Sequence, residues 1–541
     1  MTKYIFITGG NVSSLGKGIT SAAVGRLLKS RGLRVVIVKV DPYLNVDAGT
    51  MNPYQHGEVY VTDDGAETDL DLGHYERFVD IDLNKSCNVT TGKVYEQVLL
   101  NERQGKYLGG TIQVIPHITN EIKRRIRLAA RENRAEVCVV EIGGTVGDIE
   151  GQPFYEAIRQ FRNEIGRNNG LNIHLSLLPY VGPAAELKTK LTQHTVKELR
   201  GIGIQPDIIV CRCKYPLKDD LKSKISLFCD VPKECVIAGQ DTSEIYEVPM
   251  LYEKQNVADI ILRKLEVITL ENELSEWRDM VGKLKEARSA KREVHIGVVG
   301  KYIKLKDAYI SILEALKHGG IANGIEVESK LIDSGRLEKG TGLKTLDKMD
   351  GILVPGGFGY RGIEGKIRAI QYARENNVPY LGICLGMQSA VIEFARNVMG
   401  LENANSSEFD EETPHPVIDL MLSQRGITDK GGTMRLGAYP CKLKKNSIAY
   451  SSYQKFKVDE RHRHRFEFNN DFRKQFEKHG MTFTGIYQKE NLVEIVEIPK
   501  HRHFIATQFH PEFKSRPLSP HPVFVSFVEA ATKYKEEKEG K

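Results

Sequence analysis

A glycine-rich turn between an apolar strand and a helix-forming segment lies near the start of the chain, and it constrains the fold more than any other feature. Residues 4–7 are apolar, residues 8–20 are rich in Gly, Ser and Thr, and residues 21–28 favour a helix. Such a turn directs backbone N–H groups and a helix N-terminus towards an anion, and Lys17 adds a full positive charge. The sequence therefore predicts a phosphate-binding loop in an α/β domain.

The loop departs from the usual phosphate-loop spacing in two ways. Five residues separate Gly10 from Gly16, one more than usual, and Gly18 stands where Ser or Thr normally follows the lysine. The hydroxyl that holds Mg²⁺ is therefore displaced, either to Thr20 or in favour of acidic residues elsewhere.

Charged residues at later strand ends supply further candidates for a phosphate and metal site. Lys39 lies at the end of an apolar strand, and Glu141 ends the buried strand that begins near residue 136. In an open parallel sheet, ligands gather at the carboxyl ends of strands. Four acids in the non-helical stretch 65–76 suggest that Glu141 shares an ion with one of them.

A lysine- and threonine-rich segment precedes a helix predicted to start near His194. Residues 188–193 include two lysines and two threonines, and Lys224 lies on a later helix. Such a segment at a helix N-terminus is typical of an anion site. Repeated strand–helix units from residue 4 to about 265 predict one α/β domain with a mostly parallel sheet.

Length and composition narrow the class of protein. The chain has 541 residues, too many for one core, and its formal charge of +6 gives no support for nucleic acid as a partner. No apolar run is long enough to cross a bilayer. Its eight cysteines lack metal-ligand spacing, which favours reduced thiols in a cytoplasmic protein.

The stretch 266–292 is strongly charged and lacks strand patterns. Trp277, Met280, Val281 and Leu284 recur at helical spacing. One helix face should therefore be buried, and we expect a linker helix between domains.

A second strand–helix series from residue 294 contains a cysteine in a tight turn. Cys384 lies between Gly382 and Gly386, after a short apolar strand and before a helix. Glycines permit such a turn, and the helix N-terminus favours the thiolate. His510 and Glu512 follow another apolar strand and can serve as base and orienting acid. An oxyanion could be bound by backbone N–H groups of Leu385 and of the Gly356–Gly357 pair. Together these features predict acyl chemistry on an amide.

Arginine and histidine alternate in residues 461–465. Three arginines would repel a metal ion, so an anionic substrate or an interface is favoured. The charged C-terminal residues predict a solvated end.

These motifs resemble the CTP synthase family, glutamine-dependent enzymes that aminate UTP. The resemblance covers about residues 3–532 and is carried by residues 13–18, 65–78 and 143–150 and by the Cys384, His510 and Glu512 set. It implies two three-layer α/β domains with mostly parallel sheets. They are an amidoligase domain similar to dethiobiotin synthetase (1–266) and a class I glutamine amidotransferase domain (293–535), with a linker helix (267–292) and a charged tail (536–541).

The resemblance also implies site residues, carried over position by position. The implied ATP-binding residues are Ser14, Leu15, Gly16, Lys17, Gly18, Ile19, Asp71, Gln240, Asp241 and Thr242. Phosphoryl transfer is assigned to Lys17 and Lys39, and the metal ligands to Asp71 and Glu141. The implied UTP and CTP residues are Ser13, Asp148, Ile149, Glu150, Lys188, Thr189, Lys190, Leu191, Thr192, Gln193 and Lys224. The implied glutamine-binding residues are Gly357, Leu385, Gly386, Met387, Gln388, Glu408 and Arg465.

Three positions differ from the family pattern, which usually has an apolar residue at Asn11 and Thr242 and proline at Leu191. Without proline the loop before the helix is less pre-ordered, which bears on nucleotide affinity.

The implied reaction fits the motifs. ATP with Mg²⁺ phosphorylates O4 of UTP, and ammonia from glutamine then displaces phosphate at C4. The family also implies GTP activation, CTP inhibition and a homotetramer built as a dimer of dimers. Two alternatives share some of these motifs: an amidotransferase acting on a corrin carboxylate, such as a corrin a,c-diamide synthase, and a non-catalytic nucleotide-binding scaffold. The lysine-rich segment 188–193 favours a triphosphate over a corrin, and the intact Cys–His–Glu set argues against a scaffold.

Overall fold

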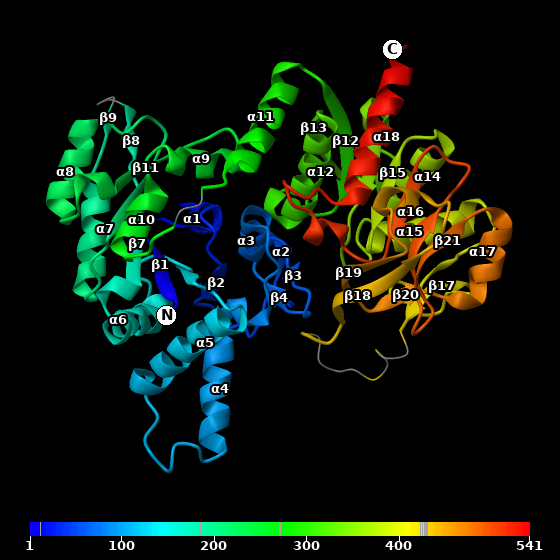
Figure 1. Cartoon of the computed structure of the whole chain (residues 1–541). Helices are drawn as coiled ribbons and strands as arrows, with labels where there is room; N and C mark the ends of the chain where they lie inside the picture. The colour runs from blue at the N-terminus through cyan, green and yellow to red at the C-terminus, as the bar shows by residue number, and fades with distance from the viewer. Residues whose placement is uncertain are drawn as a thin grey trace. The chain divides into compact units, whose positions relative to one another are not determined.

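The computed structural model describes residues 1–10, 12–182, 186–269, 272–421, 424, 426 and 431–540 (Figure 1). The chain divides into two compact units. The first contains Met1–Asp47 and Asp71–Arg278, and the second contains Ala48–Leu70 and Asp279–Lys541. Asn11 lies outside the described residues, so its departure from the family pattern stays untested.

The first unit is built on a seven-stranded sheet within the described residues. Every strand pairing in it is parallel. In sheet order the strands are β11 (Val236–Gln240), β10 (Ile208–Cys213), β7 (Gly170–Leu177), β1 (Lys3–Gly9), β6 (Val137–Ile142), β2 (Val35–Asp41) and β5 (Asn88–Thr90). The central strands are buried along nearly their whole length and mainly apolar, as both faces of a covered parallel sheet require.

Helices connect these strands and cover the sheet (Figure 1). They are α1 (Lys17–Lys29), α3 (Asp71–Val79), α4 (Thr91–Arg103), α5 (Thr119–Glu132), α6 (Gln152–Ile165), α7 (Lys190–Gly201), α8 (Asp219–Cys229), α9 (Val248–Glu253) and α10 (Val257–Lys264). Helix α1 packs against α3, α9 and α10, whereas α5 packs against α6 and α7 against α8. A short hairpin is formed by β8 (Tyr180–Val181) and β9 (Glu186–Leu187).

The second unit contains a nine-stranded sheet over the part of the chain that the structure describes. In sheet order its strands are β13 (Glu326–Asp333), β12 (Glu293–Gly300), β14 (Gly351–Val354), β15 (Tyr380–Ile383), β23 (Phe504–Thr507), β22 (Leu492–Glu497), β21 (Thr482–Tyr487), β18 (Arg435–Leu443) and β19 (Lys457–His464). The pairings from β13 to β23 are parallel, and those from β23 to β19 are antiparallel.

The helices of the second unit are α12 (Ile310–Asn323), α13 (Ser334–Glu338), α14 (Ile363–Glu375), α15 (Leu385–Asn397), α16 (Ile448–Tyr453), α17 (Arg473–His479) and α18 (Pro522–Lys538). Helix α18 packs on α12 and α16, and α14 packs on α15. A small sheet joins β16 (Asn405–Ser406), β17 (Pro416–Leu420) and β20 (Phe466–Phe468). The fold class predicted from the sequence, two α/β domains with mostly parallel sheets, is confirmed.

Residues 48–70 belong by their contacts to the second unit, although they lie between two strands of the first in the sequence. They contain α2 (Pro53–His56), β3 (Tyr60–Val61) and β4 (Glu67–Thr68). Buried contacts explain the grouping, because the Tyr60 hydroxyl donates to the carbonyl of Phe513 at 2.7 Å and Glu58 accepts from the Ser311 backbone N–H at 3.0 Å. A single domain boundary at residue 266 would place residues 48–70 in the first domain, whereas their contacts group them with the second unit.

The predicted helix in the stretch 266–292 is present as α11 (Ser275–Ser289). Its four predicted apolar positions, Trp277, Met280, Val281 and Leu284, are all buried. The Trp277 indole donates to the carbonyl of Tyr246 at 2.9 Å and packs against the rings of Phe78 and Tyr246. This single tryptophan is therefore a packing residue of the first unit.

Replacing Trp277 by alanine is expected to lower the free energy of unfolding by about 3–5 kcal/mol, because it opens a cavity and removes the hydrogen bond from the indole. Urea unfolding followed by circular dichroism measures the change. Trp277→Phe keeps an aromatic ring and should lose less. An alanine variant that unfolds at the wild-type urea concentration would contradict this packing role.

Candidate functional site

The predicted phosphate loop joins β1 to α1 in the first unit. Gly16 caps α1 with a φ of 90°, and Ser14 also has a positive φ of 56°. A Cβ at Gly18 would lie 2.1 Å from Oδ1 of Asp71, so only glycine lets the start of α1 approach the acid at the start of α3. The Lys17 ammonium donates to the carbonyl of Gly144 at 2.6 Å. Burial lowers the pKa of Lys17, which Glu141 and Asp71 partly oppose.

Lys39 joins the two predicted metal ligands. Lys39 and Glu141 are direct partners on the neighbouring strands β2 and β6, and their charged groups lie 3.2 Å apart. The Lys39 ammonium also pairs with the Asp71 carboxylate. Lys17, Lys39, Asp71 and Glu141 therefore form one charged cluster at the carboxyl ends of adjacent strands.

Environment gives the two acids opposite pKa directions. Burial raises the pKa of Glu141, which is 1 % exposed and accepts from Tyr75 and Ser21. Burial also opposes ionisation of Asp71, but Lys39 and then other nearby cations hold its pKa below its ordinary value. Carboxylate oxygens are the donors that Mg²⁺ prefers, so this pair fits a cation that also binds phosphate. In the described residues no group of three or more His, Cys, Asp and Glu is arranged to hold a metal by itself.

Thr20, one of the two possible replacements for the missing loop hydroxyl, points elsewhere. Its hydroxyl lies 2.9 Å from that of Tyr252, and it is buried. Thr20 lines a cavity of about 110 Å³ together with Leu15, Gly16 and Ile19. The geometry favours the second alternative, the acidic pair.

The same cavity contains the predicted adenine contacts Gln240, Asp241 and Thr242. Arg212 and Tyr252 also line it, and sequence reasoning missed both. The Arg212 guanidinium donates to Asp241 at 2.8 Å and to the Leu15 carbonyl at 3.1 Å. Arg212 is an exposed residue in an otherwise buried strand, which is the signal that could have marked it.

The predicted pyrimidine-nucleotide residues fall into two groups. Lys188 pairs with Glu186, and Lys224 also acts on that carboxylate, so these two lysines lie near one another. Asp148 accepts from the backbone N–H and the hydroxyl of Thr145, at 2.6 and 2.8 Å. The remaining members are Ser13, Ile149, Glu150, Lys190, Leu191 and Gln193 at exposed or half-buried positions, and Thr189 and Thr192, which are buried. Ligand contact of these residues stays a prediction.

The strand-to-helix turn at Cys384 has the geometry predicted for a nucleophile. Cys384 has φ 52° and ψ −105° between β15 and α15, and its side chain is 3 % exposed. A Cβ at Gly386 would lie 2.0 Å from the carbonyl oxygen of Val354, and one at Gly382 would lie 2.8 Å from the Ala506 Cβ. Both glycines are therefore required by close backbone approach.

His510 and Glu512 lie beside this cysteine. The Nδ1 atom of His510 is 2.7 Å from Oε1 of Glu512, which leaves Nε2 as the nitrogen that can serve the thiol. Burial lowers the pKa of His510, but Glu512 and then Cys384 raise it, to about 10 in all. The Cβ of a residue at Gly356 would lie 2.9 Å from the His510 ring and 3.5 Å from the Cys384 Cβ, so the Gly356–Gly357 backbone borders both.

A cavity of about 340 Å³ opens onto the thiol. Its lining includes the predicted glutamine-binding residues Gly357, Gln388, Glu408 and Arg465. Glu408 accepts from the Gly359 backbone N–H at 3.0 Å, and burial raises its pKa. The other predicted members, Leu385, Gly386 and Met387, lie in the first turn of α15 with buried side chains.

A second cavity of about 280 Å³ in the same unit also reaches Cys384, His510 and Glu512. Its other wall is formed by the 48–70 segment, with Gly49, Thr50, Met51, Pro53, Glu58 and Val59. The cysteine therefore borders two cavities, one lined by glutamine-binding candidates and one by this segment.

Two buried lysines near the thiol were missed by sequence reasoning. The Lys366 ammonium donates to the Pro355 carbonyl at 3.1 Å, and burial lowers its pKa to about 7. Lys301 donates to the Phe358 carbonyl, and burial lowers its pKa to about 8. Both fix carbonyls of the 355–358 loop. Lys366 lies on an amphipathic helix where lysine is normally solvated, so the sequence carried no signal for it.

The basic cluster 461–465 is divided by the alternation of β19. Arg461 pairs with Asp63 at 2.5 Å and Arg463 with Glu67 at 2.7 Å, both in the 48–70 segment. Arg465 donates to Gln424 at 2.5 Å and Thr433 at 2.7 Å beside the glutamine cavity. The partners seen here belong to the same unit, and an anionic substrate or interface at this cluster stays a prediction.

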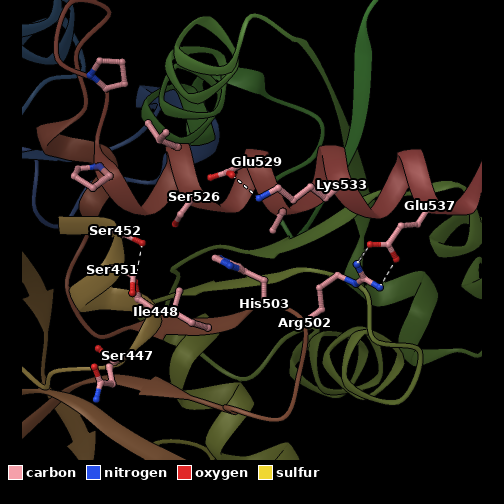
Figure 2. A pocket seen from close by; sticks show the side chains of 15 residues that line it. Ser447, Ile448, Ser451, Ser452, Arg502, His503, Ser526, Glu529, Lys533 and Glu537 are labelled. Atoms are coloured by element: carbon pink, nitrogen blue, oxygen red, sulfur yellow. Dashed lines mark hydrogen bonds and ion pairs between the residues drawn. The ribbon is translucent and has the colours of Figure 1, made fainter. Parts of the chain in front are cut away.

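A further cavity of about 810 Å³ lies away from the catalytic residues, between α16 and α18 (Figure 2). Arg502 and Lys533 on its wall pair with Glu537 and Glu529, at 2.7 and 2.5 Å. These charged residues therefore form ion pairs with one another, and Cys384, His510 and Glu512 are not among the described residues that line this cavity.

Two matches to known protein families show the class of protein to which the chain belongs. Residues 304–530 match the family described as glutamine amidotransferase class-I, and residues 3–267 match the CTP synthase N-terminus. The chain is thus an ATP-dependent ligase joined to a glutaminase.

The particular family follows from relatives of the same length. The chain is 58 % identical to CTP synthase from Staphylococcus carnosus over 100 % of both sequences, and 58 % identical to that from Pelotomaculum thermopropionicum over 99 % of both. The solved Trypanosoma brucei CTPS glutaminase domain with bound acivicin is 41 % identical, covering 44 % of this chain and 94 % of that one with a TM-score of 0.41. The chain belongs to the CTP synthase family, as its motifs predicted.

Gly386→Ala is expected to reduce glutamine hydrolysis by at least about 100-fold, because the added Cβ must displace the Val354 backbone and with it the Cys384 turn. Glutamate release measures the effect. Gly282→Ala is the matched control, since a Cβ there meets no atom within 4 Å in α11. Equal activity of the two variants would contradict the steric requirement.

Proposed function

We propose that the chain makes CTP by ATP-driven amination of UTP, using ammonia from glutamine. The observation that carries the proposal is the presence in one chain of two complete sites. One is the Cys384 turn with His510 paired to Glu512 at 2.7 Å, and the other is the cluster of Lys17, Lys39, Asp71 and Glu141. Ammonia production and phosphate activation are the two half-reactions that an amidoligase needs.

At the glutaminase site the Cys384 thiolate attacks the carboxamide carbon of glutamine. Backbone N–H groups of Leu385 and the Gly356–Gly357 segment face the developing oxyanion. His510, held by Glu512, gives its proton to the departing ammonia and later activates the water that hydrolyses the thioester.

Glutamine is held by charges at the ends of its cavity. The Glu408 carboxylate suits the substrate ammonium, Arg465 suits its carboxylate, and Gln388 can bind the amide. Ammonia would be protonated in bulk water, so release into a walled space matters. The 280 Å³ cavity that borders Cys384 supports such a route, with the 48–70 segment as its wall.

At the ligase site Lys17 and the backbone of the loop bind the ATP phosphates. Lys39 and Lys17 stabilise the charge of the transferring phosphoryl group as it moves to O4 of UTP, and ammonia then displaces phosphate at C4. Asp71 and Glu141 would hold Mg²⁺, which screens the negative phosphates when bound.

The remaining assignments follow the family resemblance. The adenine is placed in the cavity lined by Gln240, Asp241 and Thr242, and the pyrimidine triphosphate beside Asp148, the 188–193 segment and Lys224. CTP as product shares part of that site. We further propose GTP as allosteric activator, a homotetramer built as a dimer of dimers, and the cytoplasm as location.

Free thiols are typical of a reducing compartment such as the cytoplasm. All eight cysteines are free thiols. No helix in the described residues has the length and apolar character needed to cross a membrane. No nucleic acid or membrane partner is proposed.

Cys384→Ala is expected to abolish CTP formation from glutamine and to leave the ammonia-dependent reaction within about twofold of wild type. The thiol is the nucleophile only for glutamine, so ammonia bypasses it. CTP formation is followed with each nitrogen source. Retained use of glutamine would show that another group is the nucleophile, and absence of CTP from wild type with either source would overturn the substrate assignment.

Lys39→Met is expected to lower CTP formation by at least about 100-fold with either nitrogen source, because it removes a cation that neutralises the transferred phosphoryl group. Glutamate release should persist, which separates this variant from Cys384→Ala. Lys233→Met is the control, since Lys233 pairs with Asp219 on the surface, where an ion pair contributes little. Full ligase activity in Lys39→Met would remove Lys39 from the mechanism.

A further inference from the structure

A chain of buried polar side chains lies behind the glutamine cavity. It consists of Arg435 (β18), His462 and His464 (β19), Glu467 (β20) and Glu494 (β22), and each is at most 6 % exposed. His464 and Phe466 also line the cavity that reaches Cys384. Burial of so many ionisable groups is costly unless their charges and hydrogen bonds are matched.

The Phe466 carbonyl fixes the tautomer of His464. Its oxygen lies 3.1 Å from Nδ1 of His464, and a carbonyl only accepts, so Nδ1 carries the hydrogen. Burial, followed by Arg435, holds the pKa of both His464 and His462 well below the ordinary range, so both rings are neutral. Nε2 of His464 is therefore an acceptor.

The tautomer of His464 determines the tautomer of His462. Nδ1 of His462 lies 2.9 Å from Nε2 of His464, so it must donate the hydrogen. Nε2 of His462 is then a bare acceptor. It lies 3.5 Å from Oε2 of Glu494, and neither atom has another hydrogen-bond partner among the described residues. An ionised Glu494 would set two lone pairs against each other.

Charge balance requires that one of the two carboxyl groups, that of Glu467 or that of Glu494, is neutral. Among the described residues, Arg435 is the cation that donates to both, to Glu467 at 2.9 Å and to Glu494 at 2.8 Å. Burial raises the pKa of both acids, that of Glu467 well above its ordinary range and that of Glu494 to about 7. One ionised carboxylate matches the guanidinium, so the other retains a proton.

The hydrogen-bond geometry indicates which of the two acids carries the proton. Oε1 of Glu467 receives a hydrogen bond from Arg435 and lies 3.6 Å from Nδ1 of His464, and its Oε2 faces no acceptor that would require a proton from it among the described residues. Glu494 faces one donor and one bare nitrogen, which suits a carboxyl O–H. The other ionisable groups acting on the chain are Glu490, which raises the pKa of both acids, His510, which lowers that of both histidines, and the neutral thiol of Cys441.

Both ends of this chain contact residues around the thiol. The Phe466 carbonyl also accepts from the Gln388 amide at 2.9 Å. The backbone carbonyl of Glu494 accepts from the Gln508 N–H at 2.8 Å, and the Gln508 amide lies 3.7 Å from the Cys384 sulfur. The position of these buried polar side chains therefore determines the position of the cavity wall against which glutamine is proposed to lie.

We infer that Glu494 is a positioning residue for glutamine hydrolysis, acting as a neutral carboxyl that donates to His462 and so orients a relay from His462 through His464 to the Phe466 carbonyl. The inference rests on the proposed glutaminase reaction. At higher pH Glu494 loses this proton and no longer donates to His462. The relay then no longer holds the Phe466 carbonyl and the Gln388 amide bonded to it, which weakens glutamine binding.

Two isosteric variants of the full-length protein test it. Glu494→Gln keeps a donor towards His462 and an acceptor towards Arg435, so kcat/KM for glutamine should stay within about twofold of wild type at pH 6.5. Glu467→Gln removes the balancing anion and turns a donor towards other donors, so KM should rise by about tenfold or more. Ammonia-dependent CTP formation reports that each variant is folded.

The inference also predicts the direction in which kcat/KM for glutamine changes with pH. Glu494 has a raised pKa, so its proton is bound at pH 6 and lost as pH rises through about 7. An amide cannot lose its donor, so the ratio of Glu494→Gln to wild-type kcat/KM should rise severalfold between pH 6.5 and 8.5. A ratio independent of pH, or a tenfold loss in Glu494→Gln at pH 6.5, would overturn the inference.

Infrared spectroscopy gives a readout that needs neither activity nor the proposed substrate. Wild type at pH 6 should show a protonated-carboxyl stretch that shifts in D₂O, and the Glu494→Gln variant should lose one component of it in the difference spectrum. A band of unchanged shape and intensity in that variant would place the proton elsewhere and refute the assignment. If the band behaves as expected but no glutamate forms from glutamine, the proposed function fails and the protonation state stands.

Discussion

Close backbone approach at the ends of parallel strands is the constraint on which both sites depend. At Gly18 and at Gly386 a Cβ would come within about 2 Å of an oxygen, that of the Asp71 side chain in one unit and the Val354 backbone in the other. In each case a helix begins directly beneath the reacting groups, so its N–H groups are available to an anion. Larger side chains would push the helix away and with it Lys17 or Cys384. The motifs are glycine-rich because the chemistry requires short distances between backbone segments.

The parts of the sites that could be predicted are those whose geometry is local. The phosphate loop, the Cys384 turn and the His510–Glu512 pair each lie within a few residues of one another in sequence, so strand, turn and helix patterns determine their shape. The clustering of Lys39, Asp71 and Glu141 needed one further rule, that parallel strands bring their carboxyl ends together. The buried face of α11 likewise followed from the spacing of its apolar residues.

Other features depend on contacts between distant segments, and no local pattern indicates them. Lys366 and Lys301 look like solvated residues in the sequence, but the folded chain closes over them and directs them to carbonyls of the 355–358 loop. The 48–70 segment leaves the first unit's sheet because Tyr60 and Glu58 find buried partners in the second. The alternation at 461–465 could have suggested opposite faces for arginine and histidine, yet partners such as Asp63, Glu67 and Glu494 come from distant segments of the chain.

Burial shifts pKa values towards the neutral form in both sites, and ion pairs oppose that shift for particular groups. In the ligase cluster burial lowers the pKa of Lys17 and raises that of Glu141, whereas Lys39 helps to hold the pKa of Asp71 below its ordinary value. Around Cys384 burial likewise lowers the pKa of Lys366 to about 7 and raises that of Glu408, whereas Glu512 and then Cys384 raise the pKa of His510 to about 10. An amide substrate brings no net charge to its reacting carbon, so a weakly charged surrounding leaves the Cys384–His510 pair as the dominant local dipole. Strong uncompensated charges there would compete with the thiolate for His510 and would bind water instead of the amide.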